Sequence, residues 1–140
     1  MEMETILMIG ILRMKIRIIV ADDNRKALSI LVAALSAEFE VVATACDGRS
    51  ALEQIRSLQP AVAVLDLNMP ELNGIEVTRA IMQQRLISNV VICSIENDPE
   101  MIAAAQNAGA LGYVFKRKLN LDLVIAVKCA ANGKPFVSGI

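Results

Sequence analysis

The chain has 140 residues, of which 55% are hydrophobic and only 3% aromatic, and its formal net charge is -1. This length suits one domain that buries roughly two-thirds of its unfolded surface. The charge balance, without a clustered basic stripe, argues against nucleic-acid binding by this segment, and the lack of histidine excludes histidine triads and histidine metal ligands.

The amino-terminal stretch and the cysteines indicate the compartment. Residues 1–13 are apolar but too short to span a bilayer, and they begin with glutamates instead of a basic segment. We therefore expect no membrane contact and treat them as an extension of unknown role, with the domain proper over residues 14–138. Cys46, Cys93 and Cys129 are odd in number and widely spaced, as expected for reduced thiols in a cytoplasmic protein.

Strand-like and helix-like segments alternate along the first half of the chain. The apolar run at residues 16–21 predicts a buried strand, and apolar side chains at spacings of three and four predict a helix over residues 25–39. A second strand is expected over residues 41–45. The next helix begins near Asp47 and ends before Pro60, because proline disfavours helical backbone in the residue before it.

The second half repeats this alternation, and its last helix is expected to end near residue 132. Asp98 and Pro99 are typical of a helix start, as capping residue and first-turn proline. The helix that they open buries mainly alanines, so we expect it to be the least firmly docked. The predicted strands cover residues 61–66, 90–94 and 112–115, and the predicted helices before the last cover residues 74–86 and 98–108.

Five strand–helix units of this length predict an α/β fold, because crossovers between parallel strands are right-handed and place helices on both faces of a sheet. We expect a single-domain, doubly wound, five-stranded parallel sheet with five helices. In such a sheet the ligand site lies beyond the carboxyl ends of the strands.

Polar side chains follow four of the five predicted strands. Because parallel strands end at the same edge of a sheet, we expect these side chains to converge. Three carboxylates held together repel strongly, and a hard cation such as Mg²⁺ relieves that repulsion. A lysine and a hydroxyl suit phosphoryl oxygens, and a carboxylate can itself accept a phosphoryl group. The residues concerned are Asp22, Asp23, Asp66, Ser94 and Lys116.

Each of these residues also has a purely structural explanation. Asp22 and Asp23 could cap a helix or lie in a solvated loop, and Asp66 could be a turn residue. Ser94 could satisfy a strand end, and Lys116 could be an ordinary surface lysine. The joint placement on four strands favours the phosphoryl-accepting site.

The polar strand ends stand in recognisable motifs: Asp22-Asp23, Leu65-Asp66-Leu67-Asn68-Met69-Pro70 with Gly74, Ser94, and Gly112-Tyr113-Val114-Phe115-Lys116. Through these motifs, the chain resembles the receiver domains of two-component response regulators over about residues 14–138. The resemblance implies a flavodoxin-like sheet of strand order 2-1-3-4-5.

The same resemblance implies a role for each site residue. Asp66 would accept a phosphoryl group from the phosphohistidine of a cognate histidine kinase, in a Mg²⁺-dependent reaction. Lys116 would bind a phosphoryl oxygen, and Ser94 would donate its hydroxyl to another. Asp22, Asp23, Asp66 and the Asn68 carbonyl would hold the metal, with Asp22 acting directly or through water. Ser94 and Tyr113 would form a switch, and Asn68 and Glu96 would tune the phosphoryl lifetime.

The resemblance also implies what the switch controls. The protein would catalyse its own phosphotransfer and dephosphorylation rather than turn over an outside substrate. Phosphorylation would alter the surface of the helix over residues 98–108, the fifth strand and the last helix. The tail over residues 120–138 resembles receivers that precede a LuxR/NarL-type helix-turn-helix module. We therefore expect control of transcription by a following DNA-binding domain, and a homodimer on phosphorylation.

Two departures and two other hypotheses stand beside this interpretation. Ser94 replaces the more frequent threonine, and Arg117 replaces a common proline, which leaves the usual cis peptide after Lys116 open. An aspartate-nucleophile phosphohydrolase would typically have a second aspartate where Asn68 stands. A non-phosphorylated interaction module would keep the fold without binding Mg²⁺ at the acidic edge.

Overall fold

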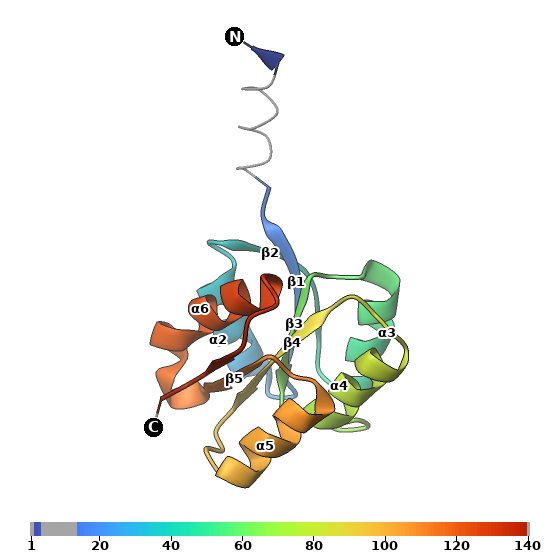
Figure 1. Cartoon of the computed structure of the whole chain (residues 1–140), viewed down its shortest axis with the longest axis vertical. Coiled ribbons are helices and arrows are strands. Elements are labelled where there is room, and N and C mark those ends of the chain that lie inside the picture. Colours follow the sequence, from blue (N-terminus) through green and yellow to red (C-terminus); the bar gives the residue numbers. More distant parts are fainter. Residues whose placement is uncertain (1, 4–13, 140) are drawn as a thin grey trace.

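The computed structural model describes residues 2–3 and 14–139, so almost all of the expected extension over residues 1–13 lies outside the described part. The strands of the domain, all parallel to their neighbours, form one sheet (Figure 1). They are β1 (Ile16–Ala21), β2 (Phe39–Ala45), β3 (Val62–Asp66), β4 (Asn89–Ser94), β5 (Gly112–Phe115) and β6 (Phe136–Val137). Their order in the sheet is β2-β1-β3-β4-β5-β6.

Five α-helices cover the two faces of this sheet (Figure 1). Two of them, α2 and α6, bury one apolar cluster against the sheet, and α3, α4 and α5 bury the other. The doubly wound α/β fold is therefore confirmed. The helices are α2 (Arg25–Leu35), α3 (Gly48–Leu58), α4 (Gly74–Gln83), α5 (Pro99–Ala108) and α6 (Leu119–Ala131), and a 3-10 turn, η1 (Lys116–Lys118), joins β5 to α6.

The sheet has one strand more than the sequence predicted. The order 2-1-3-4-5 holds for the five expected strands, but the expected count of five is wrong, because residues 136–137 pair with β5 as a sixth strand. The backbone N–H of Phe136 donates to the carbonyl oxygen of Leu111 at 3.0 Å, and that of Ser138 to Tyr113 at 2.9 Å. These hydrogen bonds cover groups of β5 that an edge strand would leave unpaired.

The first helix is shorter than predicted. It ends at Leu35, where the backbone N–H of Ser36 bonds to the carbonyl oxygen of Val32, and Phe39 begins β2 instead of ending the helix. Phe39 is buried in the same apolar cluster as Leu31 and Leu35. Its spacing from Leu31 and Leu35 is that of a helical residue, but its side chain reaches the core from a strand.

The other boundaries agree with the sequence to within a few residues. Asp98 accepts a hydrogen bond from the N–H of Glu100 and caps α5, which buries only Ala105 and Ala108. Its weak docking stays a prediction. The peptide between Lys116 and Arg117 is trans, as are all peptides of the described residues. None of the helices in this part of the chain combines the length and the apolar character that a membrane span requires.

Candidate functional site

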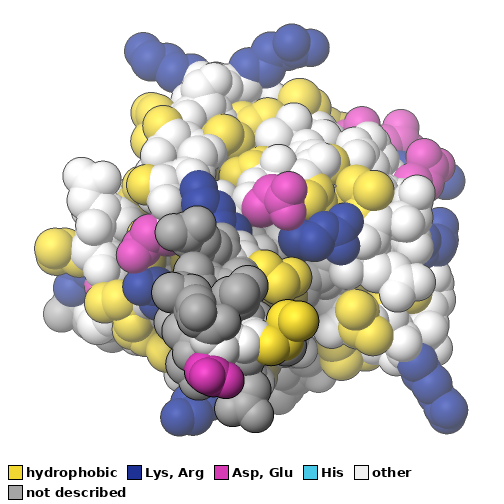
Figure 2. All heavy atoms as spheres, turned by 90° about the horizontal axis from the view of Figure 1, so that it is seen from above, with side chains coloured by type: hydrophobic (Ala, Val, Ile, Leu, Met, Phe, Trp, Pro, Cys, Tyr) yellow, Lys and Arg dark blue, Asp and Glu magenta, His cyan; other side chains and the backbone are white. Residues whose placement is uncertain are grey.

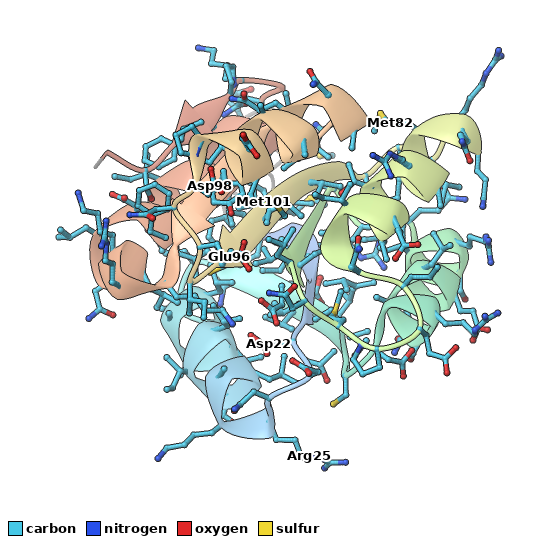
Figure 3. The ribbon with its side chains drawn as sticks, turned by 90° about the horizontal axis from the view of Figure 1, so that it is seen from below. Asp22, Arg25, Met82, Glu96, Asp98 and Met101 are labelled. Carbon is cyan, nitrogen blue, oxygen red and sulfur yellow. The ribbon has the colours of Figure 1, made fainter. Side chains whose placement is uncertain are left out.

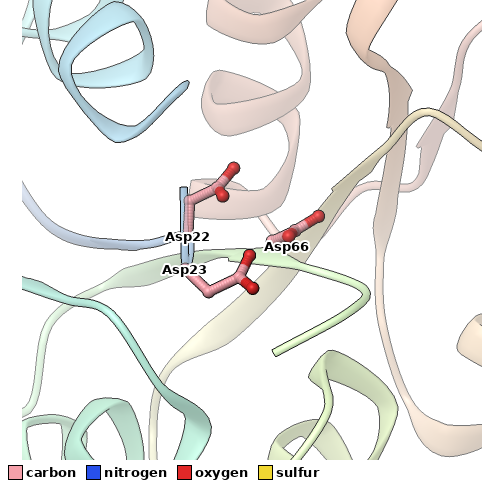
Figure 4. A group of neighbouring side chains, drawn as sticks. All are labelled: Asp22, Asp23 and Asp66. Carbon is pink, nitrogen blue, oxygen red and sulfur yellow. The ribbon is translucent and has the colours of Figure 1, made fainter. Parts of the chain in front are cut away.

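The three aspartates predicted from the sequence lie together at the edge where the strands end. Asp22 and Asp23 follow β1, and Asp66 is the last residue of β3. Each offers a carboxylate oxygen, and these oxygens all lie within 4.8 Å of one another (Figure 4). Asp22 and Asp66 are buried, whereas Asp23 is exposed. The pocket thus has an acidic wall with one face open to solvent.

Lys116, which follows β5, contacts two of the three aspartates. Its Nζ lies 2.7 Å from Oδ2 of Asp22 and 3.2 Å from Oδ1 of Asp66. The other oxygen of Asp22, Oδ1, accepts the backbone N–H of Asn24 at 2.9 Å. Both oxygens of Asp22 therefore already have protein partners, and Asp23 is the member of the cluster that faces solvent.

The electrostatics of the pocket favour an additional positive charge. At an effective dielectric constant near 20, two carboxylate oxygens within 4.8 Å repel by about 3 kcal/mol or more. Burial raises the pKa of the Asp66 carboxyl to about 6, the Lys116 ammonium opposes this rise, and the charges of Asp22 and Asp23 add to it. One ammonium thus does not compensate three carboxylates.

Lys116 itself stays protonated. Burial alone would lower its pKa, but the hydrogen bond to Asp22 and the charges of Asp66 and Asp22 outweigh burial and raise the pKa above its ordinary value. The site therefore pairs one fixed cation with three carboxyl groups, and burial raises the pKa of one of them, Asp66. That is an arrangement of the kind that functional sites often show.

The loop after β3 fixes the position of Asp66 through close backbone contacts. The N–H of Gly74 donates to the carbonyl oxygen of Leu67 at 2.9 Å, and a Cβ on Gly74 would come within 2.5 Å of the carbonyl oxygen of Asp66. On the other side, the N–H of Gly48 donates to the carbonyl oxygen of Pro70 at 3.1 Å. Only a residue without a side chain fits at position 74, so the loop folds tightly onto the strand end.

A second set of predicted residues lies beside the acidic pocket. Ser94 is buried at the end of β4, one residue after the pairing partner of Asp66. Its hydroxyl oxygen accepts the backbone N–H of Glu96 at 3.0 Å, and the Tyr113 hydroxyl donates to the Glu96 carbonyl oxygen at 2.9 Å. The Tyr113 ring is buried, and burial raises the pKa of its hydroxyl. Glu96 thus connects the serine to the tyrosine.

The two residues expected to tune the phosphoryl lifetime are in contact. The Asn68 amide nitrogen lies 3.4 Å from Oε1 of Glu96, a long hydrogen bond between the loops that follow β3 and β4. Glu96 is seen at the strand-end edge together with Asp22 (Figure 3). The opposite edge, at which the strands begin, has acidic and basic side chains interspersed among hydrophobic and neutral ones (Figure 2).

The donor set of the pocket fits a hard divalent cation. Mg²⁺ prefers oxygen ligands and keeps several waters, so one or two carboxylates facing solvent are sufficient. Asp23 offers an exposed oxygen and Asp66 a buried one beside it, while the engaged oxygens of Asp22 favour its contact through water. Cys93 on β4 is not a competing soft ligand, because it is buried and burial raises the pKa of its thiol to about 12.

Sequence reasoning missed two contributors to this region. Asn24 holds Asp22 through its backbone N–H, which no side-chain pattern reveals. Ser138 lies beside β5 and accepts the N–H of Phe115 at 3.0 Å. Its only sequence signal is a short apolar run, Phe136-Val137, which is too brief to predict a strand.

Comparison with known proteins adds an independent line of argument. A family model, the response regulator receiver domain, matches residues 18–128. The transcriptional regulatory protein DegU of Brevibacillus brevis is 35% identical over 126 residues, which cover 88% of this chain and 53% of the relative. The nitrate/nitrite response regulator protein NarL of Escherichia coli K12 is 32% identical over 124 residues, covering 86% of this chain and 57% of the relative. The chain thus spans about half the length of these curated relatives.

Solved structures agree with the sequence comparison. The signal receiver domain of the response regulator NarL from Mycobacterium tuberculosis superposes with a TM-score of 0.83 at 34% identity, covering 86% of this chain and 98% of that chain. A two-component response regulator of the LuxR family from Aurantimonas sp. SI85-9A1 superposes with the same TM-score at 29% identity. The superposition covers 88% of this chain and 89% of that chain.

Proposed function

We propose that Asp66 accepts a phosphoryl group, because this chain belongs to the family of response regulator receiver domains. The arrival of the phosphoryl group would change the conformation of the domain. The observation that supports this most strongly is the cluster of Asp22, Asp23 and Asp66, two of which, Asp22 and Asp66, pair with the Lys116 ammonium. The donor would be a phosphohistidine of a cognate histidine kinase, and that histidine must belong to the partner because this chain has none.

In the transfer step, an Asp66 carboxylate oxygen attacks the phosphorus and the phosphorus–nitrogen bond to the donor imidazole breaks. A carboxylate nucleophile and a fixed cation are both standard parts of such chemistry. Mg²⁺, held by Asp23, Asp66 and the Asn68 carbonyl with Asp22 through water, would neutralise charge on the phosphoryl oxygens. Lys116 orients one of these oxygens, and its raised pKa keeps it charged for that task.

The switch follows from the contacts of Ser94. Its hydroxyl would donate to a phosphoryl oxygen on Asp66, which draws it away from the N–H of Glu96. Because the Glu96 carbonyl is also the acceptor of Tyr113, this movement disturbs the hydrogen bond that keeps the tyrosine in its buried position. The surface of α5, β5 and α6 then changes. A ligand shifts such an equilibrium only by its different affinity for the two states.

The relatives support a proposal about the partners and the output. The DegU relative is a transcriptional regulatory protein, and both it and the NarL relative are nearly twice as long as the segment that they share with this chain. We propose a cytoplasmic regulator of transcription with a LuxR/NarL-type DNA-binding module after the receiver, and a homodimer when phosphorylated. DNA contact would belong to that module and not to the receiver.

Phosphoryl labelling with a small donor tests the function. Wild-type protein incubated with Mg²⁺ and acetyl phosphate should gain one acid- and base-labile phosphoryl group, and a chelator should prevent it. Asp66→Ala should remain unlabelled, whereas Glu53→Gln, which removes an exposed carboxylate of α3, should be labelled normally. Equal labelling of wild type and Asp66→Ala would refute the assignment. Turnover of an unrelated phosphomonoester at ordinary enzyme rates would favour a phosphohydrolase.

The contact between Asn68 and Glu96 predicts a shorter phosphoryl lifetime in Glu96→Ala. The two side chains meet between the β3 and β4 loops, and their separation would admit water to the phosphoryl group more freely. A hydrogen bond contributes about 1 kcal/mol, and a barrier to hydrolysis that is lower by this amount makes hydrolysis roughly fivefold faster. The rate at which the label decays after removal of the donor measures the phosphoryl lifetime. An unchanged decay rate would show that the contact does not control access.

A further inference from the structure

The end of the chain forms a hydrogen-bonded cluster on the side of β5 that faces away from β4. Ser138 follows β6 and is only 4% exposed. Its backbone N–H donates to the carbonyl oxygen of Tyr113 at 2.9 Å, and its hydroxyl oxygen accepts the N–H of Phe115 at 3.0 Å. The serine side chain therefore extends the pairing of β5 by one hydrogen bond beyond the end of β6.

The same hydroxyl also reaches the first turn of α6. It donates to Oδ2 of Asp122 at 2.7 Å. One side chain thus joins the last residue of β5 to the start of α6. The segment between these two points is η1, and neither its N-cap residue, Phe115, nor that of α6, Lys118, makes a side-chain capping bond.

We infer that Ser138 is a positioning residue for Lys116, which begins η1 directly after Phe115. The inference rests on the proposed function only in so far as Lys116 is to bind a phosphoryl oxygen. None of the three residues of η1 is a proline, so no ring fixes their backbone torsions. The hydrogen bonds at the ends of η1 therefore help to define where the lysine side chain starts. From there Nζ must reach Asp22 and Asp66 at 2.7 and 3.2 Å.

Removal of the Ser138 hydroxyl loosens both ends of η1 at once. The N–H of Phe115 loses its acceptor and the carboxylate of Asp122 loses its donor. The buried N–H of Phe115 then has no partner, which costs free energy, and the half-buried carboxylate of Asp122 is free to turn toward solvent, so we expect both ends of η1 to shift. Misplacement of a reacting group by about 1 Å can cost up to 100-fold in rate, so even a small displacement of Lys116 should slow phosphotransfer.

Three variants separate positioning from stability. Ser138→Ala removes the hydroxyl, Ser138→Thr keeps it, and Val137→Ala trims a half-exposed side chain of β6 while leaving Ser138 intact. Thermal melts first establish that all three fold. Two readouts follow: the rate of labelling by acetyl phosphate with Mg²⁺, and the nuclear magnetic resonance signal of the Lys116 ammonium protons in metal-free protein, which is sharp only while the ion pairs hold.

We expect Ser138→Ala to label about three- to tenfold more slowly and to lose the ammonium signal, with Ser138→Thr and Val137→Ala near the wild type. Wild-type rate and signal in Ser138→Ala would overturn the inference, and so would equal slowing in Val137→Ala. If the wild type itself is not labelled, the proposed function fails. The ammonium signal then decides the inference alone: its loss in Ser138→Ala supports positioning, and its persistence refutes it.

Discussion

Asp66→Asn is expected to unfold at a higher urea concentration than the wild type in metal-free buffer at about pH 8, although it cannot accept a phosphoryl group. The folded protein raises the pKa of this carboxyl from 3.8 to about 6, chiefly by burial. Ionisation above that pH therefore costs folding free energy, up to about 3 kcal/mol at 1.36 kcal/mol per pKa unit. Asparagine has nearly the same shape without the charge, and Lys116 keeps its contact with Asp22.

The pH dependence gives this prediction its sign. Between the unfolded and folded pKa values, the folded wild type binds more protons at Asp66 than the unfolded chain does, so its stability falls as pH rises. The advantage of Asp66→Asn should be absent near pH 4, should grow up to about pH 6 and should level off above about pH 7. Glu53→Gln is the control for charge removal outside the pocket. A wild type that is more stable than Asp66→Asn at about pH 8 would contradict the raised pKa of the Asp66 carboxyl.

Asp23→Asn is expected to weaken Mg²⁺ binding at least about tenfold and to reduce phosphoryl labelling with it. Asp23 faces solvent beside Asp66 and offers an oxygen that the engaged Asp22 carboxylate does not. Loss of one unit charge at ligand distance removes several kcal/mol of attraction at an effective dielectric constant near 20, part of which solvation returns. The rise of the thermal midpoint with Mg²⁺ concentration measures the affinity, because a ligand stabilises the state that binds it.

A matched control for Asp23→Asn exists on α3. Asp47 caps this helix by accepting the N–H of Ser50 at 2.7 Å, and asparagine caps as well as aspartate does. Asp47→Asn therefore removes the same charge outside the acidic cluster and leaves the fold intact. It should bind Mg²⁺ like the wild type. Equal affinity in Asp23→Asn and Asp47→Asn would mean that the aspartate cluster is not the metal site.

The strand ends were predictable because parallel strands deliver their last residues to one edge. Asp66, Ser94 and Lys116 each follow a buried apolar run, and the doubly wound topology brings them to that edge together with the aspartates after β1. No distance needed to be known for this step. The contact of Asn68 with Glu96 follows from the same topology, since their loops leave neighbouring strands.

Features that depend on single hydrogen bonds were not predictable. Phe39 has the spacing of a helical residue, yet the helix ends at Leu35 and the same side chain is buried from β2. The two residues of β6 are too few to show a period, and their pairing depends on the unpaired edge of β5. Ser138 is one serine among several until the fold places its hydroxyl between Phe115 and Asp122.

Titration of the Asp66 carboxyl carbon by nuclear magnetic resonance, with and without Mg²⁺, tests most directly whether the three aspartates share one charged pocket. Metal-free protein should give a pKa near 6, and saturating Mg²⁺ should lower it, because the cation stabilises the ionised carboxylate. A pKa close to 3.8 that Mg²⁺ leaves unchanged would contradict the account. It would mean that Asp66 is solvated, distant from its neighbours and unable to bind the ion that phosphotransfer requires.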